Sequence, residues 1–397
     1  MSRIAIVAHA VYPGDPRLRR QADALVAAGH EVDLFCLRAA GEAPEEQIGS
    51  VRVVRLPVHR AFGSLAGHLA EYAAFAGLAA ASLARQHRYR RYGLVQVATL
   101  PDFLIFAAAP LKLAGVPLLL DLHEDMPEFF RDRFSQKALR PLLPLVSGTA
   151  RAAAAMADQL ITVHEPLRQL SVARGVPPDK IAVVMNSADP RVFDPQRHPR
   201  RPFMEDGELR LIHHSNLQRI YGVGTLVEAI DRIGDAFPMR LDLYGDGPYR
   251  EELVRLVERL GVGDRVRFNG PVPIDDLAGL IAGADIGVVP SLPEPYMQYS
   301  LSTKLLEYAA MGIPIIASDL ATFRQHFTSD AIRYVPAGQP DALAAAITEL
   351  ASDPEQAARL GAEVLRQSAA YAWPVQARQY VKIVGRLLAP SAGRPAR

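Results

Sequence analysis

Short apolar runs alternate with amphipathic segments along almost the whole chain. A β-branched run over 4–8 is followed by apolar residues at helical spacing over 18–28, then by Gly29 and a second apolar run over 32–36. This order predicts a strand, a helix that ends at glycine, and a second strand. Further strands are expected at 51–56, 94–97, 117–122 and 159–163. Strands that alternate with helices predict a parallel sheet covered by helices.

The alternation stops between Asn186 and Leu209, where prolines follow aspartate, histidine or arginine and charges cluster. Such a segment is typical of a connector between compact units. Beyond it we expect strands at 209–213, 240–244, 266–268, 286–290 and 313–318, and helices at 225–233, 249–260, 274–282 and 303–311. The predicted organisation is two doubly wound α/β domains, at 1–200 and 201–372. A helix at 373–390 is expected to pack back on the first domain, and 391–397 is expected to be a mobile tail. Ligands in such folds bind at the carboxyl ends of the strands.

The composition fits a chain of two globular domains. The 397 residues carry 44 Lys and Arg against 43 Asp and Glu, and both signs alternate through most segments. This balance argues against nucleic acid as a partner, because proteins that track phosphates concentrate basic residues on one face. Cys36 is the only cysteine, so neither an intrachain disulfide nor a thiolate zinc site can form. Together with an N-terminal apolar run too short for a secretory signal, this predicts a cytoplasmic protein.

The segment from Ser302 to Gly312 carries the clearest chemistry. Ser302 is a suitable N-cap, and Gly312 a suitable end, for the helix between them. The free amides at the start of a helix attract an anion, and Lys304 adds a positive charge in the first turn. Glu307 lies on the same face and could accept hydrogen bonds from a diol such as ribose. The other interpretation is an exposed intrahelical Lys–Glu pair worth about 0.2–0.5 kcal/mol, and spacing alone does not separate the two.

Residues 304–314 resemble the nucleotide-sugar signature of the fourth family of glycosyltransferases, which have the GT-B fold. Other segments that agree with this family in order and spacing are 15–17, 29–32, 157–163, 180–193, 245–253, 266–270 and 284–291. A closer likeness, at 100–103, 121–124 and 127–128, is to the branch that builds bacterial surface polysaccharides and glycolipids. The resemblance implies two doubly wound parallel-sheet, Rossmann-like domains that face a cleft. Residues 1–200 would then bind the acceptor, and 201–372 the nucleotide-sugar.

By this resemblance, the donor nucleotide binds at the start of the helix 303–311. Glu307 would hold the ribose, while the backbone of Leu301, Ser302 and Thr303 meets the diphosphate. The family's second glutamate is replaced here by Tyr299, and Glu294 in the preceding loop would substitute for it in catalysis. The other donor-site residues that the resemblance implies are Asn216, Gly245 and Tyr299.

Charge compensation for the leaving diphosphate needs a separate hypothesis. After the first strand of the second domain, the family has an Arg and a Lys where this chain has Asn216 and Tyr221. We hypothesise that Arg219, in the same loop, replaces them together with Lys304; a surface arginine without this role is the alternative. His123 corresponds to a family histidine that approaches the donor sugar and the acceptor. The acceptor and cleft residues that the resemblance implies are Gly14, Asp15, Arg17, Asp102 and Glu124.

Neither a metal nor a cofactor is expected. His123 beside the acidic cluster 124–128 would also suit a metal site. However, the chain lacks an Asp-x-Asp pair of the kind that carries a metal-bound sugar nucleotide in the other major transferase fold. We therefore predict metal-independent transfer, in which Arg219, Lys304 and the helix terminus offset the phosphate charge.

Between His59 and Tyr92 the chain is rich in alanine and ends in the basic segment 85–91. Interrupted by His68 and Glu71, it falls short of the roughly 20 apolar residues needed to span a bilayer. Basic and aromatic residues beside an apolar face suit a peripheral contact with the cytoplasmic face of the membrane and a lipid-linked acceptor. A helix packed on its own sheet is the alternative.

The resemblance implies retaining transfer of a sugar from a nucleotide-sugar to a glycan or lipid-linked acceptor, in the synthesis of cell-surface polysaccharide or glycolipid. A sugar-nucleotide epimerase or hydrolase could use the same two sheets. A catalytically silent binding subunit is a further alternative, because Asn216, Tyr221 and Ala98 depart from the family pattern. A dinucleotide dehydrogenase needs Gly-x-Gly-x-x-Gly after its first strand, which the stretch 8–14 does not provide.

Overall fold

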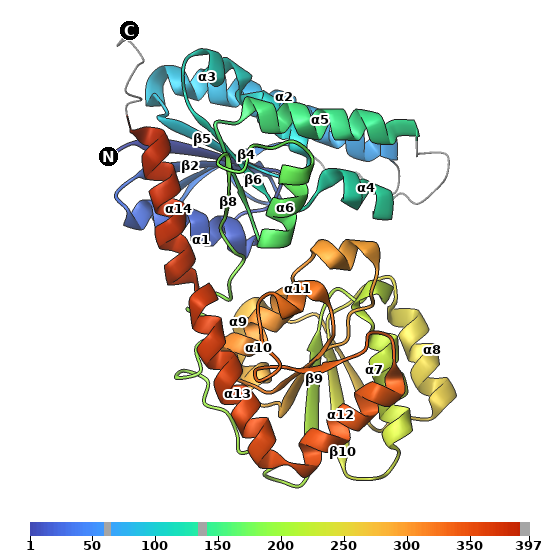
Figure 1. Ribbon diagram of the computed structural model, residues 1–397. Helices are drawn as coiled ribbons and strands as arrows, with labels where there is room; N and C mark the ends of the chain where they lie inside the picture. The colour runs from blue at the N-terminus through green and yellow to red at the C-terminus, as the bar shows by residue number, and fades with distance from the viewer. Residues whose placement is uncertain (59–64, 134–140, 390–397) are drawn as a thin grey trace. The chain divides into compact units, whose positions relative to one another are not determined.

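The computed structural model describes residues 1–58, 65–133 and 141–389, so the tail predicted at 391–397 lies outside the described residues. Two units are distinct: Met1–Asn186 with the segment from Pro374 onward, and Ser187–Trp373 (Figure 1). The first division precedes the predicted boundary at 200. The physical reason is that Val192 and Phe193 of the connector are buried in a core cluster of the C-terminal unit.

An eight-stranded sheet forms the N-terminal unit, in the order β3-β4-β2-β1-β5-β6-β7-β8. Its strands are β1 (Arg3–Ala8), β2 (Glu31–Leu37), β3 (Glu45–Ile48), β4 (Val51–Leu56), β5 (Leu94–Ala98), β6 (Leu118–Leu122), β7 (Gln159–Thr162) and β8 (Ile181–Val183). All neighbours pair in parallel except β3, which runs antiparallel to β4 at the edge. The sequence did not predict β3, because its residues are polar and largely exposed and give no signal of a buried strand.

The helices of this unit are α1 (Pro16–Ala27), α2 (Leu65–Arg90), η1 (Asp102–Ala108), α3 (Ala109–Leu113), α4 (Met126–Arg133), α5 (Leu143–Met156), α6 (Glu165–Ala173) and α14 (Trp373–Leu388). Phe75 and Leu83 of α2 are buried in the core of the unit, whereas Leu69 and Leu78 on the same helix are exposed. The helix thus packs on its own unit and also presents apolar side chains to solvent. None of the described helices combines the length and the apolar character that crossing a bilayer requires.

The C-terminal unit has a six-stranded parallel sheet in the order β11-β10-β9-β12-β13-β14. Its strands are β9 (Leu209–His214), β10 (Met239–Tyr244), β11 (Val266–Gly270), β12 (Ile286–Val289), β13 (Ile315–Ser318) and β14 (Arg333–Val335). Its helices are η3 (Arg219–Tyr221), α7 (Val223–Ile233), α8 (Arg250–Leu260), α9 (Ile274–Ala282), η4 (Pro295–Tyr299), α10 (Thr303–Met311), α11 (Ala321–Arg324), α12 (Pro340–Ser352), α13 (Pro354–Ser368) and η5 (Ala369–Tyr371). The prediction of two doubly wound α/β sheets in sequence is confirmed.

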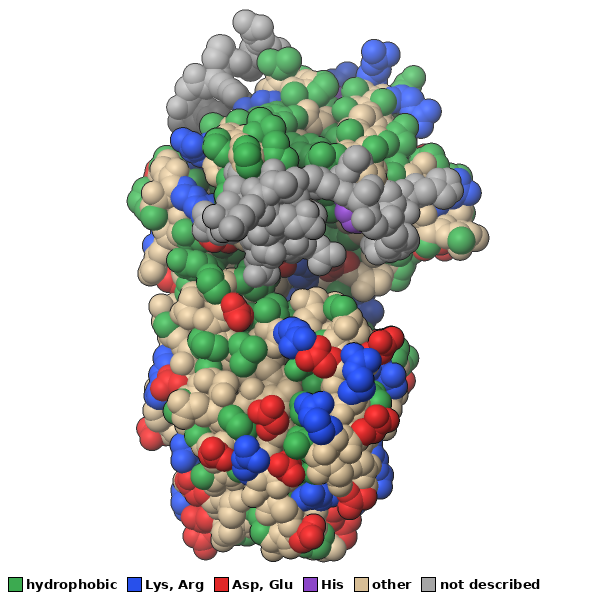
Figure 2. All heavy atoms as spheres, turned by 90° about the vertical axis from the view of Figure 1, so that its right-hand side faces the viewer, with side chains coloured by type: hydrophobic (Ala, Val, Ile, Leu, Met, Phe, Trp, Pro, Cys, Tyr) green, Lys and Arg blue, Asp and Glu red, His purple; other side chains and the backbone are tan. Residues whose placement is uncertain are grey.

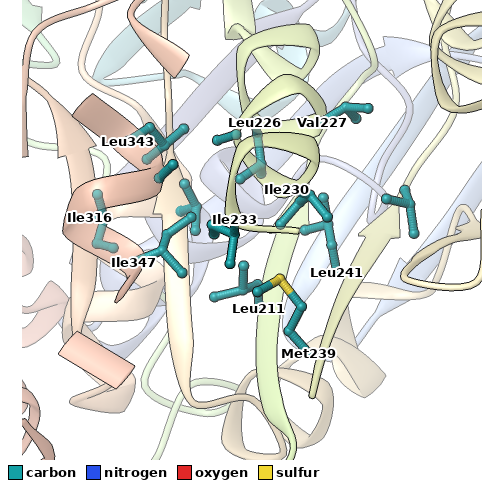
Figure 3. Packing of buried hydrophobic residues seen from close by; sticks show 14 of the residues in the cluster. Leu211, Leu226, Val227, Ile230, Ile233, Met239, Leu241, Ile316, Leu343 and Ile347 are labelled. Atoms are coloured by element: carbon teal, nitrogen blue, oxygen red, sulfur yellow. The ribbon is translucent and has the colours of Figure 1, made fainter. Parts of the chain in front are cut away.

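Apolar side chains of strands and of helices pack together in the core of the C-terminal unit. Figure 3 shows Leu226 and Ile230 of α7 and Leu343 and Ile347 of α12 near Leu211 of β9. The buried faces of these helices therefore follow the apolar stripe read in the sequence. On the surface of this unit, in contrast, Lys and Arg side chains are intermixed with Asp and Glu on the face seen in Figure 2.

The strand order reverses at one place in each sheet, between β1 and β5 and between β9 and β12. At such a switch point the loops at the carboxyl ends of two neighbouring strands leave in opposite directions and open a crevice for a ligand. These two places are therefore where each unit is expected to bind a ligand.

Helix α14 is tied to the N-terminal sheet through Tyr380, whose hydroxyl donates to Gln96 Oε1. Gln96 Nε2 in turn donates to Gln21 Oε1 at 2.8 Å. The Tyr380→Phe variant is expected to unfold with a free energy lower by about 1–3 kcal/mol, because it leaves a buried amide oxygen without its donor. Urea denaturation checks this. Arg378→Ala, an exposed neighbour on the same helix, is the control and is expected to change stability by less than about 0.5 kcal/mol; equal effects of the two variants would contradict the assignment.

Candidate functional site

The start of α10 has the character of an anion site. Ser302 occupies the N-cap position, but its side chain caps no backbone N–H, contrary to the prediction. Its Oγ is buried and, like that of Ser291 in the preceding loop, has no hydrogen-bond partner among the described residues. The helix ends at Gly312, where φ is 65°, as predicted. Uncapped amides and two spare hydroxyls can together take an anionic group.

Lys304, in the first turn of α10, is only 7% exposed. Its Nζ lies 4.2 Å from the centroid of the Tyr221 ring, a cation–π contact. Within the described part of the chain, no carboxylate oxygen lies within 4.0 Å of Nζ. Burial lowers the pKa of Lys304 to about 8, although the negative charge of Glu307 acts in the other direction. The interpretation of Lys304 and Glu307 as an exposed ion pair is therefore wrong.

A pKa near 8 has a measurable consequence for anion binding. At pH 8 about half of Lys304 is neutral, and a bound diphosphate raises its pKa, so binding is expected to take up about half a proton. Titration calorimetry of a nucleoside diphosphate in two buffers of different ionisation enthalpy measures this uptake. We expect a buffer-dependent enthalpy for the wild type and none for Lys304→Met. Identical enthalpies in both buffers would show that the protonation of Lys304 does not change when the ligand binds.

Glu307 is held by a histidine that the sequence did not single out. His214, the last residue of β9, places Nε2 2.6 Å from Glu307 Oε2 and Nδ1 3.0 Å from the Tyr308 hydroxyl. Both Glu307 and His214 keep about one seventh of their side-chain surface exposed. The carboxylate is thus fixed in direction yet accessible to a ligand. Two consecutive histidines at the end of a predicted strand were the available signal.

The neighbouring His213 has a structural role. Its Nδ1 lies 2.9 Å from Val288 O, and its Nε2 lies 2.9 Å from Ser215 Oγ. Burial and the charge of Lys304 hold the pKa of His213 well below its usual value. This neutral ring therefore links β9 to β12 at the switch point.

Glycines bring three loops of the C-terminal unit together. Gly222 has φ of 68°, and a Cβ there would lie 1.8 Å from Pro290 O. Gly245 has φ of 116°, and a Cβ would lie 1.9 Å from Ser215 O. No other residue type fits at these positions. The loops that follow β10 and β12 thus both lie against the loop that follows β9, and Asn216 lies against the loop of Gly245, where a Cβ on Gly247 would lie 2.5 Å from Asn216 Oδ1.

Arg219 lies in the same loop but points toward α8. It forms an ion pair with Glu252 and lies 4.8 Å from the centroid of the Tyr249 ring, with about two thirds of its side chain exposed. An exposed arginine that pairs with a carboxylate is also the geometry of the surface arginine kept as the alternative. Glu294 precedes η4 and is exposed, and Tyr299 ends η4 and is 37% exposed. Of the backbone group, Leu301 is half-buried and Thr303 exposed.

In the N-terminal unit, a cavity of about 190 Å³ opens at the switch point between β1 and β5. His123 lines it, with Nε2 3.1 Å from Asp121 Oδ2 and its backbone N–H donating to Thr99 Oγ1 at 3.2 Å. His123 Nδ1 has no hydrogen-bond partner among the described residues. Asp121 also accepts from Gln21 Nε2 at 2.8 Å. The carboxylate therefore fixes the ring and leaves one nitrogen for a ligand.

Asp15 and Arg17 line the same cavity. The Asp15 side chain caps α1 by accepting from the backbone N–H of Arg17 at 2.9 Å, and it pairs with the Arg17 guanidinium at 2.7 Å. Burial alone would raise the pKa of Asp15, but the hydrogen bonds and charge of Arg17 outweigh it and lower that pKa. His9 and Tyr72, which the sequence did not indicate, complete the wall with ring centroids 4.7 Å apart.

The remaining predicted acceptor residues lie elsewhere. Asp102 and Glu124 line a second cavity of about 390 Å³, which shares no lining residue with the first. Gly14 is exposed and lines neither cavity. The structure thus places Asp15 and Arg17 in one pocket and Asp102 and Glu124 in the other, and leaves Gly14 outside both. Among the residues described, no three His, Cys, Asp or Glu side chains come together in a way that could hold a metal ion.

Two family descriptions match the sequence of the chain. The description "Glycosyl transferase 4-like domain" matches residues 14–187, and "Glycosyl transferases group 1" matches residues 208–353. An uncharacterized glycosyltransferase of Methanocaldococcus jannaschii is 28% identical over 204 residues, which are 49% of this chain and 51% of that protein. The chain spans about half the length of the curated relatives it matches, 51% and 42% for two of them.

Solved structures share the fold over nearly the whole chain. Sucrose-phosphate synthase from Thermosynechococcus elongatus has a TM-score of 0.77 at 22% identity and covers 98% of this chain and 99% of its own. HepE of Anabaena, in complex with UDP and glucose, has a TM-score of 0.70 at 19% identity and covers 97% and 100%. At these identities the likeness concerns the fold.

Proposed function

Because this chain belongs to the group 1 glycosyltransferases and has the GT-B fold, we propose that it transfers a sugar from a nucleotide-sugar donor to an acceptor hydroxyl. The observation that carries the proposal is the site at the start of α10. This site contains the buried Lys304, the hydroxyl groups of Ser291 and Ser302 that are unpaired among the described residues, and the uncapped backbone amides at the start of α10. Glu307 lies on the same helix. A nucleoside diphosphate has the matching chemistry, namely an anionic diphosphate next to a ribose diol.

The proposed mechanism is electrostatic. The diphosphate lies at the amides of α10 with Lys304, and the ribose hydroxyls donate to the Glu307 carboxylate that His214 orients. The acceptor oxygen attacks the anomeric carbon, the bond from that carbon to the phosphate oxygen breaks, and the nucleoside diphosphate leaves with the electron pair. The acceptor proton passes to the departing phosphate. Stabilising the charge that develops on the diphosphate is the main contribution of the protein.

We further propose that transfer proceeds with retention, that Lys304 replaces a metal in offsetting the phosphate charge, and that Arg219 adds to it from the loop edge. Retention predicts a product with the donor's anomeric configuration, which NMR of the purified product reads directly. Chelation with EDTA is expected to leave the rate unchanged. Arg219→Ala is expected to lower donor affinity; unchanged affinity and turnover would remove Arg219 from the mechanism.

For the acceptor we propose a glycan or lipid-linked sugar used in cell-surface polysaccharide or glycolipid synthesis, bound in the N-terminal unit around His123. The support is the cavity beside His123 and Arg17 and the exposed apolar side chains of α2, which are followed by the basic residues Arg85 and Arg88 on the same helix. Such a face suits peripheral contact with anionic headgroups on the cytoplasmic side of a membrane. Co-sedimentation with vesicles containing phosphatidylglycerol, but not with phosphatidylcholine alone, tests this contact.

A thermal-shift screen of nucleoside diphosphates and nucleotide-sugars tests the proposed function. HepE binds UDP, so UDP and UDP-glucose are the first probes, followed by the ADP, GDP and dTDP series. A ligand at a hundredfold excess over its Kd stabilises the folded state by about 2.7 kcal/mol, which corresponds to a rise in Tm of about 5 °C or more. We expect one nucleotide series to give this shift. If none does, the proposed function fails.

A nucleotide-binding subunit without turnover is the second candidate. It is favoured by Asn216 and Tyr221, which place an amide and an aromatic ring where cations are usual in the family. Release of nucleoside diphosphate from the donor identified in the screen separates the two functions. Any catalysed release excludes the silent subunit, and the products distinguish a transferase from a hydrolase or an epimerase.

A further inference from the structure

The second cavity of the N-terminal unit has the dimensions of a small-molecule site. It lies between the end of β6, the loop to α4, the middle of α5 and the end of α6. Its volume of about 390 Å³ is within the roughly 300–1,000 Å³ found for ligand pockets. The cavity lies apart from the switch point of the sheet, because its lining contains no residue of β1 or β5. It is therefore additional to the cavity around His123.

Asp102 is the group in this cavity that lacks a partner. It is the first residue of η1 and is 4% exposed, and its Oδ1 has no hydrogen-bond partner in the described part of the chain. Leaving a buried polar atom unpaired costs about 1–3 kcal/mol, so such an atom indicates a missing partner. Burial, together with the charge of Asp125, raises the pKa of Asp102 to about 7. Near neutral pH the carboxyl can therefore both donate and accept a hydrogen bond.

The described charged groups around Asp102 are of both signs, with one more carboxylate than guanidinium group. Arg174 donates to Asp125 Oδ1 and, at 2.8 Å, to Glu128 Oε1. Asp125 Oδ1 also accepts from the backbone N–H of Glu128 at 2.9 Å and so fixes the first turn of α4. Glu124 and Arg151 add one charge of each sign to the lining. A ligand with a strong net charge of either sign would meet both attraction and repulsion here.

Apolar side chains make up most of the rest of the wall, among them Leu122, Ala154 and Val176, and Ser147 and Ser171 also line it. A cavity with a largely apolar wall, a carboxyl that both donates and accepts, and charges of both signs matches a neutral sugar ring, which has C–H faces and several hydroxyl groups. We propose that this cavity binds a sugar of the acceptor, one that is distinct from the sugar at His123, with Asp102 bonded to its hydroxyls. The proposal rests on the proposed transferase function and specifies its acceptor as a chain of more than one sugar.

Saturation-transfer difference NMR on the whole protein tests this, with the methyl glycosides of glucose, galactose, mannose, rhamnose and N-acetylglucosamine as probes. At least one is expected to bind the wild type. Asp102→Asn keeps a group that donates and accepts and is expected to bind within about threefold, whereas Asp102→Leu loses the bonds and weakens binding about tenfold or more. Ala150→Phe, which adds a phenyl ring to the cavity wall and leaves the Asp102 carboxyl in place, is expected to weaken binding at least as much as Asp102→Leu.

Ala152→Phe, the same change at an exposed residue of α5 that lines neither cavity, is the matched control and is expected to retain the signal. The proposal is overturned if no glycoside binds the wild type, if Asp102→Leu and Ala150→Phe bind the glycosides as tightly as the wild type does, or if Ala152→Phe weakens binding as much as Ala150→Phe. Circular dichroism and the Tm of each variant show that it is folded. A thermal shift with the nucleotide that binds the C-terminal unit must persist in all variants; its absence from the wild type refutes the proposed function instead.

Discussion

Replacing Glu307 with alanine is expected to weaken nucleoside diphosphate binding by about two orders of magnitude or more. Each hydrogen bond from a ribose hydroxyl to a carboxylate is worth about 1.5–3 kcal/mol, and two such bonds are lost together. The geometry supports a large effect, because His214 holds the carboxylate at 2.6 Å and little rearrangement is needed when the ribose binds. Titration calorimetry with the nucleotide found by thermal shift gives the change in Kd.

Two variants sharpen the test of Glu307. Glu349→Ala removes a carboxylate of the same unit that pairs with Arg333 at 2.7 Å, and it is expected to leave Kd unchanged. His214→Ala keeps the Glu307 carboxylate but releases it, so an intermediate loss of about tenfold is expected. If Glu307→Ala and Glu349→Ala bind alike, the ribose does not lie at Glu307.

Lys304→Met is expected to lower turnover by about 10²–10³-fold while raising the free energy of unfolding. The loss arises because a buried cation that offsets the leaving diphosphate is worth about as much as one oxyanion-hole donor. The gain arises because burial disfavours the ammonium, as its lowered pKa shows. A fall in the pKa from its ordinary value to about 8 corresponds to a penalty of up to about 3 kcal/mol, which the variant no longer carries.

The stability gain has a defined pH dependence. Below pH 8 Lys304 is protonated in both the folded and the unfolded state, and the full penalty applies. Between about pH 8 and pH 10.4 the unfolded state binds more protons, so the wild type gains stability as the pH rises and the advantage of Lys304→Met shrinks. Urea denaturation at pH 7 and pH 9.5 measures both differences. A variant that is less stable than the wild type at pH 7 would show that the cation–π contact with Tyr221 outweighs burial.

Much of the fold could be predicted because strands and helices that pack into a core show the matching apolar periodicity in their own sequence. The strand at 51–56 and the helices at 274–282 and 303–311 have the predicted bounds. The edge strand β3 was missed because its residues are polar and show no apolar pattern. They form a strand because they pair with β4 at the edge of the sheet. The same limit explains the domain boundary, since Val192 and Phe193 give no sign in sequence of the unit on which they pack.

The sequence predicted which residues form the candidate site better than it predicted which residues they contact. Helical spacing placed Lys304 and Glu307 on one face, but it could not reveal that Tyr221 from another loop covers Lys304, or that His214 from β9 pairs with Glu307. Such contacts depend on which strands become neighbours in the sheet. Sequence order likewise could not show that His123 and Asp102, both near strand ends, line different cavities.

A crystal structure of the protein with the nucleoside diphosphate found by thermal shift tests the central claim most directly. The account predicts ribose hydroxyls within about 3.2 Å of the Glu307 carboxylate, with the diphosphate at the backbone amides of Ser302 and Thr303 and facing Lys304. A nucleotide bound elsewhere in the chain, with the start of α10 unoccupied and the Glu307–His214 pair unchanged, would contradict it.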